Sequence, residues 1–186
     1  MYLNGKEPVA ARWQRDDEPI SHASAAARGL DISRVGALVL EKTQLMRETM
    51  SSVLRNLGMR DVRAAGSVDY AFELLVDRPA DIIFTDWGPS LDGIEFLQIL
   101  RRDPRSPNPY VPVVMVTANT EPRHVRCARD SGMTEYLAKP YSAVTVYKHI
   151  RAIAESKRPF VKMASFFGPD RRRRAMDFCG AERRLA

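Results

Sequence analysis

The sequence predicts an α/β fold, a five-stranded parallel sheet that is doubly wound and covered by helices on both faces. Short apolar runs alternate with amphipathic segments five times between residues 35 and 156. The apolar runs are continuous, which is typical of strands buried on both faces. Each amphipathic segment is long enough to be the helical crossover that parallel strands require.

The first half of this pattern predicts three strands and two helices, each with its own boundary signal. The strands are "VGALVL" (35–40), "DVRAA" (61–65) and "DIIFT" (81–85). The first helix covers 43–57, with apolar residues at helical spacing and Gly58 placed to end it. The second begins after Ser67, whose hydroxyl can cap it, and ends before Pro79.

The second half repeats the alternation. The valine-rich run 111–117 and "EYLAK" (135–139) are predicted strands. Helices are predicted at 91–103, at 121–132, where Gly132 ends the helix, and at 143–156. The predicted organisation is therefore a flexible N-terminal arm (1–33), the α/β domain (34–156) and a basic C-terminal tail (157–186).

Polar residues gather where the predicted strands end. Because the site of such a fold lies at the carboxyl ends of its strands, these side chains are expected to meet. The set contains carboxylates, a hydroxyl, a phenol and ammonium groups. It consists of Glu41, Lys42, Asp86, Thr117, Tyr136 and Lys139.

The motifs "FTDWGPSLDG", "VTAN" and "YLAKP" resemble the receiver domain of bacterial response regulators, the CheY-like family, over residues 34–156. The resemblance implies that Asp86 is the phosphoacceptor and that Thr117 and Lys139 contact the phosphoryl group. It implies that Tyr136 swings inward on activation, and that a sensor kinase is a partner.

Two departures from the family pattern concern Mg²⁺. Two adjacent acids normally end the first strand and hold the ion together with the acceptor aspartate, whereas here Glu41 is followed by Lys42. An ammonium cannot be a ligand of Mg²⁺, and Lys42 can instead pair with Asp86. The loop after Asp86 is also one residue shorter than usual. We expect no Mg²⁺ site, no catalysis and weak or absent phosphorylation; the alternative is a divergent receiver that accepts phosphate with Glu41 alone.

The net charge of +6 lies entirely in the tail, where nine basic residues oppose three acids from residue 157 onward. Segregated charge of this kind indicates an anionic partner. Asp170 can cap a helix that begins at Arg171 and ends near Gly180. Four consecutive arginines would ring such a helix, which suits a small ligand that can be wrapped.

The side chains of the tail match cyclic di-GMP. Arginine binds phosphate and the O6/N7 edge of guanine, and carboxylates accept from guanine N1 and N2. Phe166, Phe167 and Phe178 offer faces for stacking. The predicted ligand-binding residues are Asp170, Arg171, Arg172, Arg173, Arg174, Asp177, Arg183 and Arg184.

"FFGPDRRRR" after a CheY-like domain also resembles the arginine-rich extension of the Cle (CleD-like) cyclic di-GMP effectors of alphaproteobacteria. The resemblance implies docking on the flagellar motor switch, through a face near the last two helices and the fifth strand, and control of motility and surface attachment.

Three alternatives for the tail stay open: a nucleic-acid contact with steep salt dependence, an anionic membrane surface, and a partner dock in a phosphorelay. The sequence shows neither a signal peptide nor a membrane-spanning run, so we expect a cytoplasmic protein that is recruited to the flagellar base.

Overall fold

The computed structural model describes residues 30–88, 91–156, 158–163 and 166–170. Five parallel strands form one sheet in the order β2-β1-β3-β4-β5, which confirms the predicted α/β class. The strands are β1 (Gly36–Leu40), β2 (Asp61–Ala65), β3 (Ile82–Asp86), β4 (Val113–Thr117) and β5 (Glu135–Ala138). The helices are α2 (Gln44–Asn56), α3 (Val68–Asp77), α4 (Gly93–Arg102), α5 (Pro122–Asp130) and α6 (Ala143–Glu155).

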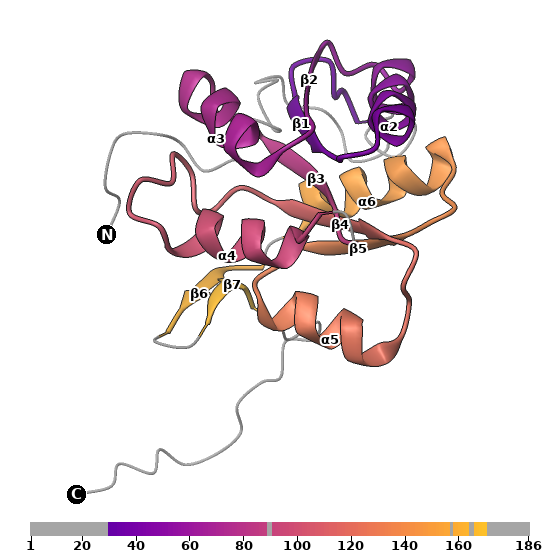
Figure 1. Cartoon of the computed structure of the whole chain (residues 1–186). Helices are drawn as coiled ribbons and strands as arrows, with labels where there is room; N and C mark the ends of the chain where they lie inside the picture. Colours follow the sequence, from indigo (N-terminus) through magenta and orange to yellow (C-terminus); the bar gives the residue numbers. More distant parts are fainter. Residues whose placement is uncertain (1–29, 89–90, 157, 164–165, 171–186) are drawn as a thin grey trace, which may run out of the picture.

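The sheet lies between helices on both of its faces (Figure 1), and an apolar cluster fills the space on each side. One face packs on α2 and α6, where Leu54 and Ile150 are fully buried, and the other packs on α3, α4 and α5. Neighbouring residues of a strand serve opposite layers, as Val39 and Leu40 do in β1. This two-sided burial is why the strands are continuously apolar in sequence.

The expected helix boundaries occur. Ser67 accepts a hydrogen bond from the Tyr70 amide at the start of α3. Gly58 and Gly132 follow α2 and α5 in the left-handed region, with φ of 106° and 97°. At the other end of the domain, Ile32 is only 3% exposed, so the folded body begins before residue 34. Residues 1–29 of the predicted N-terminal arm lie outside the described residues.

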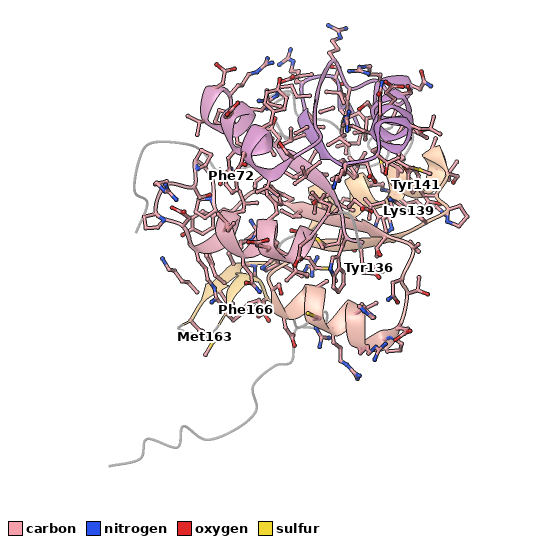
Figure 2. The ribbon with its side chains drawn as sticks, in the orientation of Figure 1. Phe72, Tyr136, Lys139, Tyr141, Met163 and Phe166 are labelled. Atoms are coloured by element: carbon pink, nitrogen blue, oxygen red, sulfur yellow. The ribbon has the colours of Figure 1, made fainter. Side chains whose placement is uncertain are left out.

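The chain also forms a hairpin that the sequence pattern did not predict. Strands β6 (Phe160–Lys162) and β7 (Phe167–Pro169) are antiparallel, and Figure 2 labels Phe166 within the hairpin and Met163 at its turn. The Tyr110 ring lies 5.5 Å from that of Phe160 and 5.1 Å from that of Phe167, edge to face. The folded body therefore continues to Asp170, beyond the predicted boundary at 156.

Burial of the hairpin aromatics corrects one part of the ligand prediction. Phe166 and Phe167 are each only 6% exposed, because their rings gain more from packing against the domain than from exposure to water. Neither ring is free to stack on a guanine. Phe178 lies outside the described residues.

A buried arginine joins α4 to the hairpin. The Arg101 guanidinium is 2% exposed and donates to the carbonyls of Gly132, Pro109 and Val111 at 3.2, 2.8 and 2.8 Å. It also lies over the Phe160 ring, 5.2 Å from the centroid. Burial lowers the pKa of Arg101 to about 9, which leaves the side chain charged at neutral pH.

Candidate functional site

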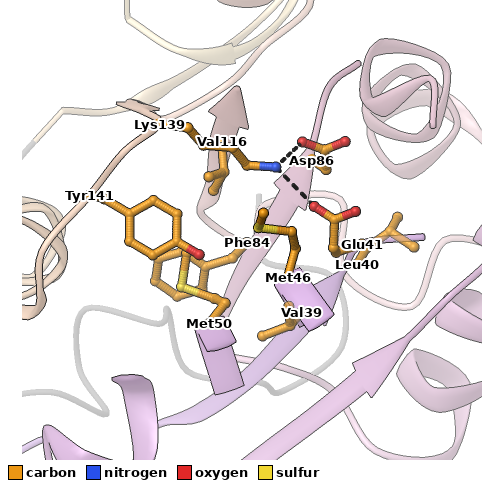
Figure 3. Close-up of a pocket in the computed structure, with 10 residues that line it drawn as sticks. All are labelled: Val39, Leu40, Glu41, Met46, Met50, Phe84, Asp86, Val116, Lys139 and Tyr141. Atoms are coloured by element: carbon orange, nitrogen blue, oxygen red, sulfur yellow. Dashed lines mark hydrogen bonds and ion pairs between the residues drawn. The ribbon is translucent and has the colours of Figure 1, made fainter. Parts of the chain in front are cut away.

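Three of the predicted site residues, Glu41, Asp86 and Lys139, meet at the carboxyl ends of the strands (Figure 3). Glu41 follows β1, Asp86 ends β3 and Thr117 ends β4. All three side chains are buried, with Thr117 only 1% exposed. Two carboxylates taken out of water at this edge require a counter-charge, since an isolated buried charge is costly.

Lys139 supplies that counter-charge. Its Nζ lies 2.6 Å from Asp86 Oδ1 and 2.9 Å from Glu41 Oε2, so one ammonium bridges both carboxylates. Burial lowers the pKa of Lys139, but the hydrogen bonds to Asp86 and Glu41 outweigh burial and the net shift is upward. Lys139 therefore stays charged.

Lys42 does not take the place that the sequence suggested. Its side chain is exposed, and among the described residues the ammonium bound to Asp86 belongs to Lys139. Both residues follow the end of β1, and only the Glu41 side chain is buried, whereas the long Lys42 side chain reaches the solvent. The predicted pairing of Lys42 with Asp86 is wrong.

The site offers two carboxylate side chains as possible ligands for Mg²⁺. The ion prefers several oxygen ligands in octahedral geometry, and the described site offers Glu41 and Asp86, both already bound to Lys139. Within the described ranges, no cluster of three or more potential metal-ligating side chains occurs. Lys42 stands where the family places its second acid, so the missing ligand is a feature of the chain itself.

A small cavity lies beside the carboxylates, which the sequence pattern did not indicate. Its volume is about 10 Å³, room for about one water molecule. The apolar part of its wall includes Met46, Met50 and Tyr141, which Figure 3 shows below Lys139. Burial raises the pKa of Tyr141, and its phenol stays neutral beside the charged groups. These residues come from segments that are far apart in the sequence, so only the folded structure shows that they line one cavity.

Thr117 and Tyr136 lie on the neighbouring side of the site. The Tyr136 hydroxyl donates to the backbone carbonyl of Asn119, and the Asn119 amide donates to Thr117 Oγ1 at 3.1 Å. Burial raises the pKa of Tyr136, and a hydrogen bond with Thr117 opposes that shift. Figure 2 shows Tyr136 at the α5 side of the sheet. The predicted pair is thus brought together through the β4–α5 loop.

The same loop holds a residue that sequence reasoning missed. His124 on α5 lies 3.2 Å, through Nε2, from the Asn119 side-chain nitrogen, and its ring is 5.3 Å from that of Trp87. Trp87 directly follows Asp86. His124 therefore links the loop after the acceptor position to the loop that carries Thr117 and Asn119, a contact that no local motif encodes.

The predicted tail site reaches the described structure only at its first residue. The Asp170 amide donates to the Pro159 carbonyl at 2.8 Å, next to the paired ends of the hairpin. The remaining predicted ligand-binding residues lie outside the described part of the chain, as does the predicted tail helix. They are Arg171, Arg172, Arg173, Arg174, Asp177, Arg183 and Arg184.

Lys139 should give stability a specific pH dependence. A raised folded-state pKa means that the stabilisation is complete below the ordinary lysine pKa, about 10.5, and is lost as pH rises through the folded value. Lys139→Met should lower the free energy of unfolding by about 3 kcal/mol at pH 7, because it leaves two buried carboxylates unpaired. The difference from wild type should shrink above pH 10.5, as urea unfolding would show.

The control variant is Lys42→Met, whose free energy of unfolding should match that of the wild type at every pH. An equal loss of stability in this variant would contradict the assigned bridge.

The sheet order, the acidic ends of β1 and β3 and the lysine that follows β5 are the features of a response regulator receiver. The family profile described as response regulator receiver domain matches residues 37–151, and the chain belongs to this family. The predicted CheY-like receiver domain is thereby confirmed.

Individual relatives agree on the class. The chemotaxis protein CheY of Pseudomonas aeruginosa is 30% identical over 119 residues, which cover 63% of this chain and 94% of that protein. The chemotaxis protein CheY-3 of Vibrio cholerae is 29% identical over 119 residues, covering 63% of this chain and 90% of the relative.

Solved structures share the fold. CheY4 of Vibrio cholerae superposes with a TM-score of 0.58 at 23% identity, covering 64% of this chain and 98% of that one. A putative response regulator from Chloroflexus aurantiacus gives a TM-score of 0.58 at 24% identity, covering 66% and 98%. About a third of this chain, including the arginine run, therefore lies beyond the shared domain.

Proposed function

We propose that this receiver responds to cyclic di-GMP, which its arginine-rich tail binds, and then docks on a protein partner, the flagellar motor switch. The observation that carries the proposal is the segregation of charge. Beyond Asp170, six arginines face two acids, Asp177 and Glu182, within sixteen residues. Arginine recognises both phosphate and guanine, and aspartate completes guanine recognition at its Watson–Crick edge.

The state of the acceptor site supports an input other than phosphate. Asp86 and Glu41 are already neutralised in part by one ammonium, and the chain lacks the second acid that the family uses for Mg²⁺. Phosphorylation of Asp86 would require Lys139 to leave Glu41. It would also have to proceed without the complete set of Mg²⁺ ligands that the family uses. A reversible ligand bound elsewhere needs none of these steps.

Phosphorylation at Asp86 is the second candidate function, favoured by the presence of Thr117 and Lys139 in the family arrangement. We expect no acyl phosphate after incubation with acetyl phosphate and Mg²⁺, measured by intact-mass spectrometry. Lys42→Asp restores the acidic pair and should allow labelling, whereas Lys42→Asp combined with Asp86→Asn should not. Stable labelling of the unmodified chain would contradict the assignment of a non-phosphate input.

The proposed ligand is tested by calorimetric titration of cyclic di-GMP at near-physiological salt. The intact chain should bind with micromolar or tighter affinity, and a chain that ends at Asp170 should not bind. The truncation belongs after Asp170 and not after Ser156, because the hairpin up to Pro169 packs on Tyr110 and Arg101. GMP and a short duplex DNA serve as matched competitors.

Each result has one meaning. Binding that disappears on truncation supports a second-messenger sensor, while absence of binding to the intact chain overturns it. Equal affinity for duplex DNA with a steep salt dependence would assign the tail to nucleic acid instead. Vesicles of anionic lipid test the membrane alternative in the same format. Among the described helices, none has the length and apolarity that crossing a bilayer requires.

A further inference from the structure

The outer strand of the hairpin, β6, has an open edge. Its residues are half-buried or exposed, whereas the three residues of β7 are buried. β7 contacts α4, and a Cβ atom on Gly168 would lie 2.6 Å from the Cα atom of Gly132, so β7 is packed against the domain. Figure 1 shows β7 between β6 and α5. The edge of β6 that faces away from β7 is therefore the free edge of this small sheet.

Backbone hydrogen bonds show which residue of β6 faces β7. Met163 and Phe166 exchange two of these bonds, at 2.7 and 3.3 Å. Hydrogen-bonded pairs of an antiparallel ladder recur at every second residue, so the next such pair is Val161 with Gly168, which lie opposite each other in the observed register. The main-chain groups of Val161 therefore hold β6 to β7.

Phe160 and Lys162 have main-chain groups that point away from the hairpin. Each presents one N–H and one C=O on the open edge, and no residue in the described part of the chain forms a hydrogen bond with these groups. An open edge of this kind is a template for a further strand. The family profile ends at residue 151, so the edge is an addition to the shared receiver domain.

The open edge is complementary to itself. When two copies of β6 pair antiparallel about Val161, Phe160 of each copy lies opposite Lys162 of the other. Each such pair exchanges an N–H···O bond in both directions, because its main-chain groups face the partner strand. All the open groups of both strands are then satisfied.

The side chains favour the same register. Opposite residues of a ladder share one face of the sheet, so each Lys162 ammonium lies beside the Phe160 ring of the other copy. Lys162 already lies over an aromatic ring in this way, 5.4 Å from the centroid of Phe167. The β-branched Val161 side chains meet at the centre, where the strands come closest. A register centred on Lys162 would instead bring two ammonium groups together.

Exposed apolar side chains flank the edge. Tyr110 is 52% exposed and packs on the Phe160 ring, and Met163, which follows β6, is 64% exposed. We propose that β6 is an interface between two copies of this chain, which join their hairpins into one four-stranded antiparallel sheet centred on Val161. This pairing would cover part of the exposed apolar surface. The inference does not depend on the proposed ligand.

The interface predicts how two substitutions of Lys162 in the full chain behave. Lys162→Pro removes the N–H on the open edge and leaves the bonds between Val161 and Gly168 in place. Lys162→Thr is the matched control, because it removes the same charge and keeps the N–H. Sedimentation equilibrium should show a reversible dimer for the wild type and for Lys162→Thr, and association weaker by about tenfold or more for Lys162→Pro. Limited proteolysis should show an intact hairpin in both variants.

Cysteine cross-linking provides an independent readout of the register. In a Cys127→Ser and Cys179→Ser background, Val161→Cys places a thiol of each copy at the twofold axis, where Cα atoms lie about 4.5 Å apart and a disulfide can form. Met163→Cys is the control, because its two copies are offset by about four residues, or about 14 Å, which is too far for a disulfide. Oxidation should link only the Val161→Cys variant into a dimer on non-reducing gels.

The outcomes decide whether a second copy occupies the edge. A dimer that Lys162→Pro weakens and that Val161→Cys traps supports the interface. A chain that stays monomeric at every concentration overturns it and would leave the edge to a strand of a different protein. A dimer that Lys162→Pro leaves unchanged, or one that neither cysteine variant or both variants trap equally, shows that the copies meet elsewhere and that the inference is wrong.

Discussion

Replacing Arg171, Arg172, Arg173 and Arg174 with alanine should weaken cyclic di-GMP binding at least a hundredfold. A charge-assisted hydrogen bond contributes about 1.5–3 kcal/mol, and two such contacts already exceed the 2.7 kcal/mol that a hundredfold change represents. The midpoint of thermal unfolding should stay near wild type, because the core contacts of the receiver and the hairpin involve other residues. Titration calorimetry and circular dichroism measure the two quantities.

A lysine version of the same segment separates charge from geometry. Four lysines keep the positive charge but lose the planar fork that binds phosphate and guanine through two hydrogen bonds. We expect this variant to bind at least tenfold more weakly than wild type, with a steeper fractional loss when salt is raised. Wild-type affinity in the lysine variant would contradict specific recognition and indicate binding by charge alone.

Gly132→Ala should be the most damaging single substitution in the described turns. Gly132 has φ of 97°, and a Cβ atom there would lie 2.2 Å from the carbonyl oxygen of Phe167 in β7. The variant therefore carries backbone strain of about 1–3 kcal/mol and a clash with backbone that has no flexible end to move. We expect the hairpin to separate from α5, which would expose the buried Phe167 and Arg101 side chains to water.

Gly58→Ala is the matched control for that substitution. Gly58 has φ of 106°, but nothing lies within 4 Å of the added Cβ, so only the backbone strain applies. Urea unfolding should show a larger loss of free energy for Gly132→Ala than for Gly58→Ala. Limited proteolysis should cut the hairpin only in the Gly132 variant. Equal losses and an intact hairpin in both would show that the Gly132–Phe167 contact does not hold the hairpin.

The receiver could be predicted from the sequence because its signals are local. Buried strands, caps such as Ser67 and the helix-ending glycines each occupy a few neighbouring residues. The site followed from topology alone, since parallel strands bring Asp86, Thr117 and Lys139 to one edge. One part of the site prediction was wrong, the pairing of Lys42 with Asp86, because the Lys42 side chain is exposed at the end of β1.

The hairpin could not be predicted in this way. Its strands have three residues each, too short to show a period of two. Phe167 gains its burial from Tyr110, more than fifty residues earlier in the chain, and that partner is invisible to local pattern. Aromatic residues next to arginines therefore looked like a ligand surface when two of them belong to the core.

The contact of Arg101 with Phe160 helps to hold the hairpin at one end of the receiver domain. The Arg101 side chain donates to the carbonyls of Gly132, Pro109 and Val111, which lie before β5 and β4. Asp86 lies at the opposite ends of the strands, about 17 Å away for a five-residue strand. Mutations around Arg101 therefore need not disturb the site around Asp86, and mutations in that site need not disturb the hairpin. A receiver built this way can lose its phosphotransfer chemistry and acquire a new stimulus through separate evolutionary steps, each leaving a folded intermediate.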